Sequence, residues 1–157
     1  TGLINKVKPT DDELAQVMGH EISHALANHT AERMSMAMAS QLGMVAVAIA
    51  TSNSRYQSTA LAGSALAAQM ALELPNSRTS EAEADEIGIK LAAKAGYNPN
   101  AAASLWEKMA RVGGSTPPEF MSTHPSPGNR QQTLRALAPI MMAYYNPDSR
   151  HPVYPLN

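Results

Sequence analysis

The chain has 157 residues, a formal net charge of −1 and no cysteine. The length suits one domain with a real hydrophobic core, and the near-neutral charge removes the electrostatic case for nucleic acid as a partner. Without cysteine, disulfides and thiolate ligands are excluded, so any metal site must use His, Asp or Glu. Aromatic residues make up only 4% of the chain, while Ala and Met are common, so we predict a mainly α fold of closely packed helices.

The first predicted helix runs from about residue 10 into the thirties. Thr10 and Glu13 have the spacing of a capping box, and the two aspartates between them place negative charge where the helix dipole favours it. Apolar residues then recur every three or four positions as far as Leu26, which indicates an amphipathic helix.

Two further apolar helices are expected next. Residues 34–54 carry no charged side chain, but their strongest apolar stretch, MVAVAIA at 44–50, is far shorter than the ~20 residues that span a bilayer. We therefore expect a buried or interface helix there and not a membrane span. Residues 59–74 predict another helix of small side chains.

Pro75 and Asn76 are expected to interrupt the helical pattern. Cap candidates at 77–80, followed by acidic residues, predict that a new helix starts there. Gly96 stands where a glycine commonly ends a helix.

The last third of the chain alternates predicted helices with proline-rich segments. Asn98 as N-cap and Pro99 as first helical residue predict a helix that the following Gly-Gly pair ends. After a proline-rich loop we expect a final helix over 127–137, with a resumption beyond Pro139 left open. The tail from 146 to 157 is expected to be irregular.

The stretch GHEISHALANH, residues 19–29, contains the pattern H-E-x-x-H. His20 and His24 lie four residues apart, on one helical face, so two imidazoles can hold one metal ion. Glu21 is rotated by about 100° and can reach a metal-bound water without being a ligand. This is the arrangement of zinc-assisted peptide hydrolysis. The alternative is a helix with solvated histidines and no metal.

A catalytic zinc site also needs a third protein ligand. His29 would point about 140° away from the second histidine on a continuous helix, so we interpret it as solvated or capping. The segment SEAEADEIG offers carboxylates instead. Glu81 and Asp85 share one helical face, and Glu83 points away from it. The alternative is an acidic first turn that interacts with its own helix dipole.

The motifs HEISH (20–24), SRTSEAEAD (77–85) and STHPSPGNR (122–130) together resemble the M48 family of zinc metallopeptidases, the Ste24/HtpX/Oma1-like gluzincins. The resemblance covers about residues 1–135, with the three motifs in the family's order. It implies a zincin-like catalytic domain with little of the usual N-terminal β-sheet. It also implies one Zn²⁺ per chain.

The resemblance implies specific roles at the metal. His20, His24 and Glu81 would be the zinc ligands. Glu21 would be the general base and later the proton donor to the leaving amine.

It also implies three supporting roles. Asp85 would hold a ligand histidine in its tautomer, and His124 would stabilise the tetrahedral oxyanion. Arg130 would buttress the site through Asp85 or a substrate carbonyl. From the residues alone, His124 is a loop histidine and Arg130 a helix-surface arginine. His151 in the tail stays unassigned.

The function that follows is a zinc-dependent endopeptidase that hydrolyses peptide bonds in proteins or peptides. One alternative is a zinc-binding, chaperone-like or regulatory module without turnover, and another is a plain helical interaction domain. A further hypothesis is autoinhibition, in which residues 43–72 or the C-terminal tail cover the cleft.

We treat residues 1–157 as a single peptidase domain. Its start at Thr1, without Met, predicts a piece excised from a longer protein. The resemblance implies a periplasmic or membrane-associated protein, with membrane association through segments outside this chain. The sequence does not define an oligomeric state.

Overall fold

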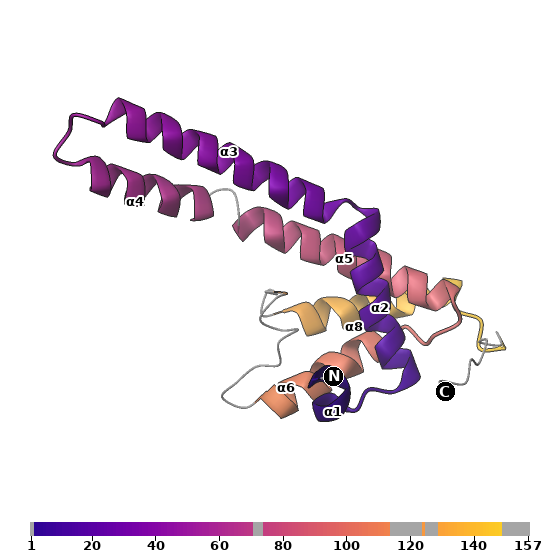
Figure 1. Cartoon of the computed structure of the whole chain (residues 1–157). Coiled ribbons are helices and arrows are strands. Elements are labelled where there is room, and N and C mark those ends of the chain that lie inside the picture. Colours follow the sequence, from indigo (N-terminus) through magenta and orange to yellow (C-terminus); the bar gives the residue numbers. More distant parts are fainter. Residues whose placement is uncertain (1, 71–73, 114–123, 125–128, 149–157) are drawn as a thin grey trace, which may run out of the picture.

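The computed structural model describes residues 2–70, 74–113, 124 and 129–148, and within these residues it contains helices and turns but no strand (Figure 1). The predicted mainly α fold is confirmed. The helices are α1 (Gly2–Val7), α2 (Asp11–Leu26), α3 (His29–Ala50), α4 (Gln57–Ala68), α5 (Leu74–Lys94), α6 (Ala101–Gly113) and α8 (Arg130–Met141), followed by the 3-10 turn η2 (Met142–Tyr144).

The start of α2 is the predicted capping box. The Thr10 hydroxyl accepts a hydrogen bond from the Glu13 N–H (3.3 Å), and the Thr10 N–H donates to the Glu13 carboxylate (2.8 Å). The same carboxylate accepts from Ser104 (2.7 Å) and Lys108 (2.6 Å) on α6. Burial opposes ionisation of Glu13, but these hydrogen bonds outweigh it and hold the pKa of Glu13 below its ordinary value. A local cap thereby also joins two helices.

The end of α2 differs from the prediction. The helix stops at Leu26 instead of running into the thirties, because Asn28 adopts a left-handed backbone conformation with φ of 58°. Asn enters this region more readily than most residues. The chain turns there, and α3 begins at His29 in a new direction.

The helices α3 and α4 form an antiparallel pair that extends away from the other helices (Figure 1). We call this pair, residues 29–68, the arm. Five large apolar residues on α3 are each more than half exposed, and their spacing of three or four residues puts them on one face. This outer stripe consists of Met34, Met38, Leu42, Val45 and Ile49.

We expected residues 34–54 to form a buried or interface helix, and the buried alternative is wrong, because none of the most apolar window of α3 is buried. The prediction that this segment does not span a membrane stays a prediction. By length and composition alone, the 22-residue helix α3 suffices to cross a membrane, and its most apolar 18-residue window has a mean hydropathy of 1.3. Core helices and signal sequences meet the same criterion.

The helix α5 begins earlier than predicted. It starts at Leu74 and includes Pro75 and Asn76 in its first turn, where a helix needs no intrahelical N–H bond. Its predicted end is confirmed: Gly96 has φ of 89°, and the N–H of Tyr97 reaches back to the Ala92 carbonyl at 2.9 Å.

The final helices also shift relative to the prediction. Asn98 accepts a hydrogen bond from the Asn100 N–H (2.9 Å), as an N-cap does, but regular helix begins only at Ala101. The predicted stop before Pro139 is wrong, since α8 continues through it to Met141. Most of the proline-rich loop and the tail after residue 148 lie outside the described residues.

The core lies between α2, α5, α6 and α8, and α2 and α5 make the most extensive helix contact. Their backbones meet at two glycines: a Cβ added to Gly19 would lie 2.5 Å from the Gly88 carbonyl oxygen, and one added to Gly88 would lie 2.7 Å from the His20 nitrogen. The buried apolar cluster consists of Val7, Val17, Ile89, Ala102, Leu105, Trp106, Met109, Leu134, Ala138 and Met141.

The crossing of α2 and α5 is tested by Gly88→Ala. We expect a loss of about 1–3 kcal/mol in the free energy of unfolding, because the added methyl group collides with backbone. Gly43→Ala is the matched control, since nothing lies within 4 Å of its Cβ position. It should stabilise the chain by up to about 1 kcal/mol through helix propensity. Thermal and urea unfolding measure both, and equal stability of the two variants would contradict the close crossing.

Candidate metal centre

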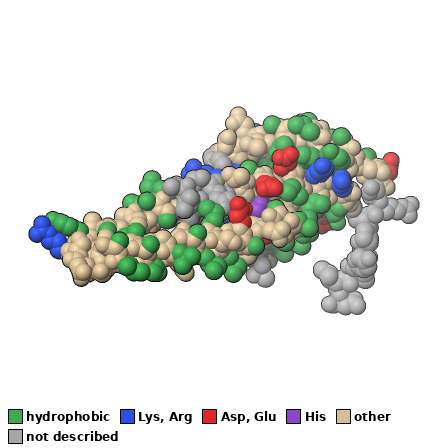
Figure 2. Space-filling view, turned by 90° about the horizontal axis from the view of Figure 1, so that it is seen from above, with side chains coloured by type: hydrophobic (Ala, Val, Ile, Leu, Met, Phe, Trp, Pro, Cys, Tyr) green, Lys and Arg blue, Asp and Glu red, His purple; other side chains and the backbone are tan. Residues whose placement is uncertain are grey.

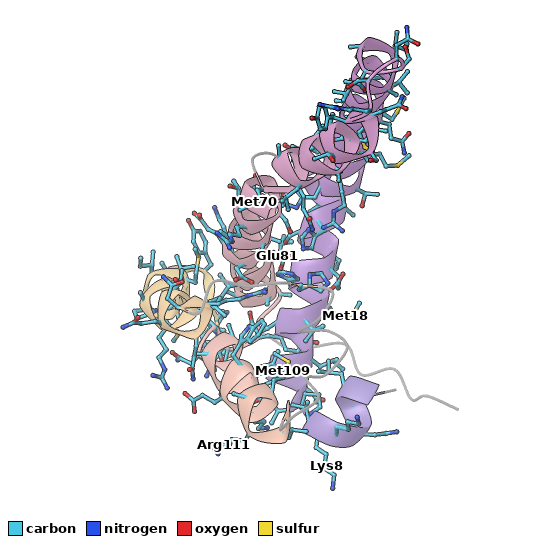
Figure 3. All side chains as sticks on the ribbon, turned by 90° about the vertical axis from the view of Figure 1, so that its left-hand side faces the viewer. Lys8, Met18, Met70, Glu81, Met109 and Arg111 are labelled. Carbon is cyan, nitrogen blue, oxygen red and sulfur yellow. The ribbon has the colours of Figure 1, made fainter. Side chains whose placement is uncertain are left out.

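Four side chains from three parts of the chain converge beside the crossing of α2 and α5. His20, His24, Glu81 and His124 each offer one ligand atom, and these atoms all lie within 4.8 Å of one another. Figure 3 shows Glu81 between α5 and α2. The structure therefore brings the three predicted ligands, His20, His24 and Glu81, together, with His124 as a fourth candidate ligand.

The two α2 histidines face the same point. The Nε2 atoms of His20 and His24 are 3.1 Å apart, and each lies 3.3 Å from an oxygen of Glu81. Glu81 is almost fully buried, with 1% of its surface exposed. The four-residue spacing on α2 produces this arrangement, because both imidazoles leave the helix from one face.

His124 and Glu21 lie on the open side of this cluster. The Nδ1 atom of His124 is 3.0 Å from Glu81 Oε1 and 3.2 Å from His20 Nε2. Its Nε2 atom is 3.3 Å from Glu21 Oε1, and the Glu21 side chain is 46% exposed. Glu21 is therefore next to the cluster, with access to solvent, and is not one of the four converging groups.

Asp85 and Arg130 lie behind the cluster. Asp85 Oδ1 is 3.0 Å from His20 Nδ1, the ring nitrogen that faces away from the converging atoms. Arg130 contacts Asp85 at 2.5 Å and Glu81 at 3.1 Å, and its guanidinium carbon stands 4.3 Å from the centre of the Trp106 ring. The stacking of Arg130 on Trp106 was not predicted, because it joins α6 to α8 without any local signal.

Burial and hydrogen bonding set the charges of the cluster. Burial opposes ionisation of Glu81, but hydrogen bonds with His124 and His20 outweigh it and hold the pKa of Glu81 well below its usual range. Burial lowers the pKa of His24 to about 4, with a further contribution from the neighbouring imidazoles. Burial also acts to lower the pKa of His20, yet hydrogen bonds with Asp85 and Glu81 raise it above its ordinary value overall.

His29 contradicts its predicted role as a solvated or capping residue. It is only 4% exposed, and its Nδ1 atom is 2.8 Å from His24 Nδ1. The prediction assumed one continuous helix, and the turn at Asn28 invalidates it. The asparagine directly before the histidine was the only sequence signal of this turn. His151 lies outside the described residues.

The donor set fits a zinc ion. Imidazole nitrogens and one carboxylate are ligands that zinc accepts in tetrahedral sites, and two of the imidazoles come from one helix face, as in the H-E-x-x-H arrangement. The lowered pKa of Glu81 favours its charged carboxylate, and the lowered pKa of His24 favours its neutral imidazole. Both are the states that bind a metal.

Comparison with known proteins decides the family. The profile of peptidase family M48 matches residues 1–138. The chain belongs to peptidase family M48. The M48 resemblance of the three motifs is thereby confirmed, as is the fold class, a mainly α M48 catalytic domain. Membership of this metallopeptidase family implies a metal cofactor, and the His/Glu cluster is a group that could bind it.

Several M48 relatives match most of the chain. The mitochondrial metalloendopeptidase OMA1 of Arabidopsis thaliana is 37% identical over 90% of this chain and 27% of its own length. The human metalloendopeptidase OMA1 is 38% identical over 88% of this chain and 28% of its own length. The beta-barrel assembly-enhancing protease of Escherichia coli is 32% identical over 80% of this chain and 27% of its own length.

The M48 chain thus spans only about a quarter of the length of these curated relatives. No solved structure matches the chain.

The buried ion pairs of this M48 domain are tested by Arg130→Met. We expect a loss of about 3–5 kcal/mol in the free energy of unfolding, because two buried carboxylates would lose their cation. Arg135→Met on the same helix is the control, because Arg135 is 59% exposed and its ion pair with Glu107 lies at the solvent-accessible surface, where such pairs contribute little to stability. Urea unfolding of both variants measures the difference, and similar losses would show that Arg130 is not a structural cation.

Proposed function

We propose that the chain is the catalytic domain of a zinc-dependent endopeptidase. The observation that carries the proposal is the convergence of two histidines from α2 and a glutamate from α5, with a second, half-exposed glutamate at its open side. The names of the relatives agree with it, since they are metalloendopeptidases or proteases. In the proposal His20, His24 and Glu81 hold the metal.

Zinc in such a site would acidify a bound water and polarise the scissile carbonyl. Glu21 is the proposed general base: its exposed carboxylate accepts the proton of the attacking water and later donates it to the leaving amine. Asp85 and Arg130 keep His20 and Glu81 in place from behind. This division leaves the solvent side of the cluster for substrate.

His124 has a position that restricts its role. It lies close enough to the cluster to act as a fourth ligand, but a catalytic zinc site must keep one position open. We therefore propose that His124 stands beside the open position during hydrolysis and donates to the oxyanion. Its contact with Glu21 at 3.3 Å supports this role, because His124 then lies next to the proposed general base.

The substrates in this proposal are proteins or peptides, and residues 1–157 act as one domain. The single buried cluster joining α2, α5, α6 and α8 supports one domain. Nothing in the structure favours a zinc-binding module without turnover. Residues 43–68 lie in the arm, which extends away from the crossing of α2 and α5, and this does not favour their proposed role as a cover over the cleft (Figure 1).

Metal content and hydrolysis test the proposed function. We expect about one zinc per purified chain by mass spectrometry and a sharp loss of retained zinc in Glu81→Ala, because one of the three protein ligands is removed. Glu21→Gln should keep the metal but hydrolyse casein about 10²–10⁴-fold more slowly, because general-base catalysis is removed. A wild-type chain that binds no zinc after reconstitution would overturn the metallopeptidase proposal. Zinc binding with equal casein hydrolysis by Glu21→Gln would overturn the role of Glu21.

We also propose that the protein is membrane-associated through the arm, in addition to the association expected through segments outside this chain. No charged residue occurs between Arg33 and Arg55 or from residue 56 to 72. Figure 2 shows apolar and uncharged side chains along the visible face of the arm, with charged ones at its tip and towards the body. At a rise of ~1.5 Å per residue, α3 is about 33 Å long, close to the ~30 Å hydrocarbon core of a bilayer.

Two features distinguish α3 from other apolar helices. A core helix would be buried, and α3 is not. A signal sequence would precede the folded domain, whereas α3 lies inside the family match, between the metal-site residues His24 and Glu81. Beyond Arg33, α3 carries no charged side chain. Apolar helix surface of this kind is expected to be covered, and lipid is the occupant we propose.

Vesicle flotation tests the membrane proposal. The wild-type chain should float with vesicles of phosphatidylethanolamine and phosphatidylglycerol, and Leu42→Glu combined with Ile49→Glu should abolish this, because it places charges in the outer stripe. Both residues are 70% exposed, so the fold should tolerate the changes. Ile140→Glu on α8, at a residue that is 64% exposed, is the matched control and should float. Failure of the wild type to float, or flotation of the double variant, would refute the proposal.

A further inference from the structure

His29 is a buried histidine that the proposed mechanism does not use. It is the first residue of α3, it is 4% exposed, and its ring lies 4.9 Å from that of His24 at an interplanar angle of 71°. It is not among the four residues whose ligand atoms converge. Its place therefore calls for a role other than metal binding.

The two ring nitrogens of His29 each have a partner. Nδ1 lies 2.8 Å from His24 Nδ1, and Nε2 lies 3.4 Å from a carboxylate oxygen of Glu83. Glu83 is on α5, two residues beyond Glu81, and its side chain is 54% exposed. A continuous chain of contacts thus leads from the exposed edge of α5 to a ring at the metal centre.

The orientation of His24 fixes the direction of these hydrogen bonds. Its Nε2 atom faces the cluster, so that atom needs a free lone pair to bind a metal, and the proton of the neutral ring must be on Nδ1. That N–H then donates to His29 Nδ1. His29 in turn carries its own proton on Nε2 and donates it to Glu83. In this arrangement every donor has one acceptor.

His20 shows the same arrangement with a different partner. Its Nε2 atom faces the cluster, and its Nδ1 atom lies 3.0 Å from Asp85. Metal-binding histidines almost always donate their second ring N–H to a carboxylate, a carbonyl or water. Within the described residues, His29 occupies for His24 the place that Asp85 occupies for His20.

We propose that His29 is a positioning residue that holds His24 in its metal-binding tautomer and orientation, with Glu83 holding His29 in turn. This inference rests on the proposed function, because it assigns His24 to a metal. It goes beyond that function by adding two residues that contact neither metal nor substrate. Glu83 contacts His24 only through His29, whereas Asp85 contacts His20 directly. Because the Glu83 side chain is half exposed, its hydrogen bond is the weaker one in this chain of contacts.

Two substitutions of His29 separate positioning from packing. His29→Asn keeps an acceptor oxygen close to the place of Nδ1, because both atoms are bonded to Cγ. His29→Leu keeps a side chain of similar bulk without any acceptor. We expect His29→Leu to weaken zinc binding about 10–100-fold, as loss of such a partner typically does, and His29→Asn to recover most of the affinity. Competition with a chromophoric chelator measures the affinities.

Glu83→Gln should weaken zinc binding less than His29→Leu, since its contact is longer and half exposed. Glu86→Gln, at an exposed position on the same helix, is the matched control and should bind zinc as the wild type does. Zinc affinity of His29→Leu equal to that of the wild type would overturn the inference. Equal weakening by the Leu and Asn variants would also overturn it, because packing alone would then explain the loss.

The tautomer of His24 gives a readout that does not depend on metal. In the zinc-free wild type at pH 8, long-range ¹H–¹⁵N spectra should show the His24 proton on Nδ1, and in His29→Leu a mixture with the Nε2 form. If the wild type binds no zinc, the proposed function fails, and this spectrum still decides the role of His29. If His24 in His29→Leu has the same tautomer as in the wild type, the positioning role of His29 is refuted, even if the variant binds zinc.

Discussion

The metal centre depends on how closely α2 and α5 cross. Zinc binds nitrogen and oxygen ligands at about 2 Å, so ligand atoms from two helices must come within a few ångströms of each other. Gly19 and Gly88 permit this, because a Cβ at either position would stand less than 3.0 Å from the backbone of the other helix. Glu81, Asp85 and Gly88 follow one another at intervals of four and three residues, so one face of α5 both packs against α2 and carries the carboxylates.

The same crossing buries two carboxylates, and the fold compensates only one of them with a fixed charge. Arg130 contacts both Glu81 and Asp85, and its stacking on Trp106 holds it between them. Two anions against one cation leave an excess of negative charge next to His20 and His24. Burying uncompensated charge costs free energy, and a divalent cation at this place would offset that cost. The centre is therefore electrostatically suited to a metal, and its cation-binding property follows from the ion pairs behind it.

Sequence rules predicted the features whose causes lie within a few residues. The cap at Thr10 and the stop at Gly96 were predicted correctly, because local hydrogen bonds and backbone angles determine them. The turn at Asn28 was missed, because no glycine or proline marks it and the predicted helix was extended beyond the apolar repeat that ends at Leu26. The position of His29 was lost with it. Spacing placed the paired site residues on their helix faces. The position of Arg130 at the site could be predicted only from the family resemblance. Tertiary packing brings Arg130 there, and no local sequence pattern indicates it.

The arm explains how residues that are far apart in the sequence form one compact site. Both ends of the segment between His24 and Glu81 lie next to the crossing of α2 and α5, and the arm between them extends away from it (Figure 1). At one end, the turn at Asn28 directs the chain outward and at the same time places His29 against His24. At the other end, α5 leads directly into Glu81. The length and surface of the arm can therefore adapt to its surroundings without moving a ligand, whereas a change in the turn would reach the metal centre directly through His29.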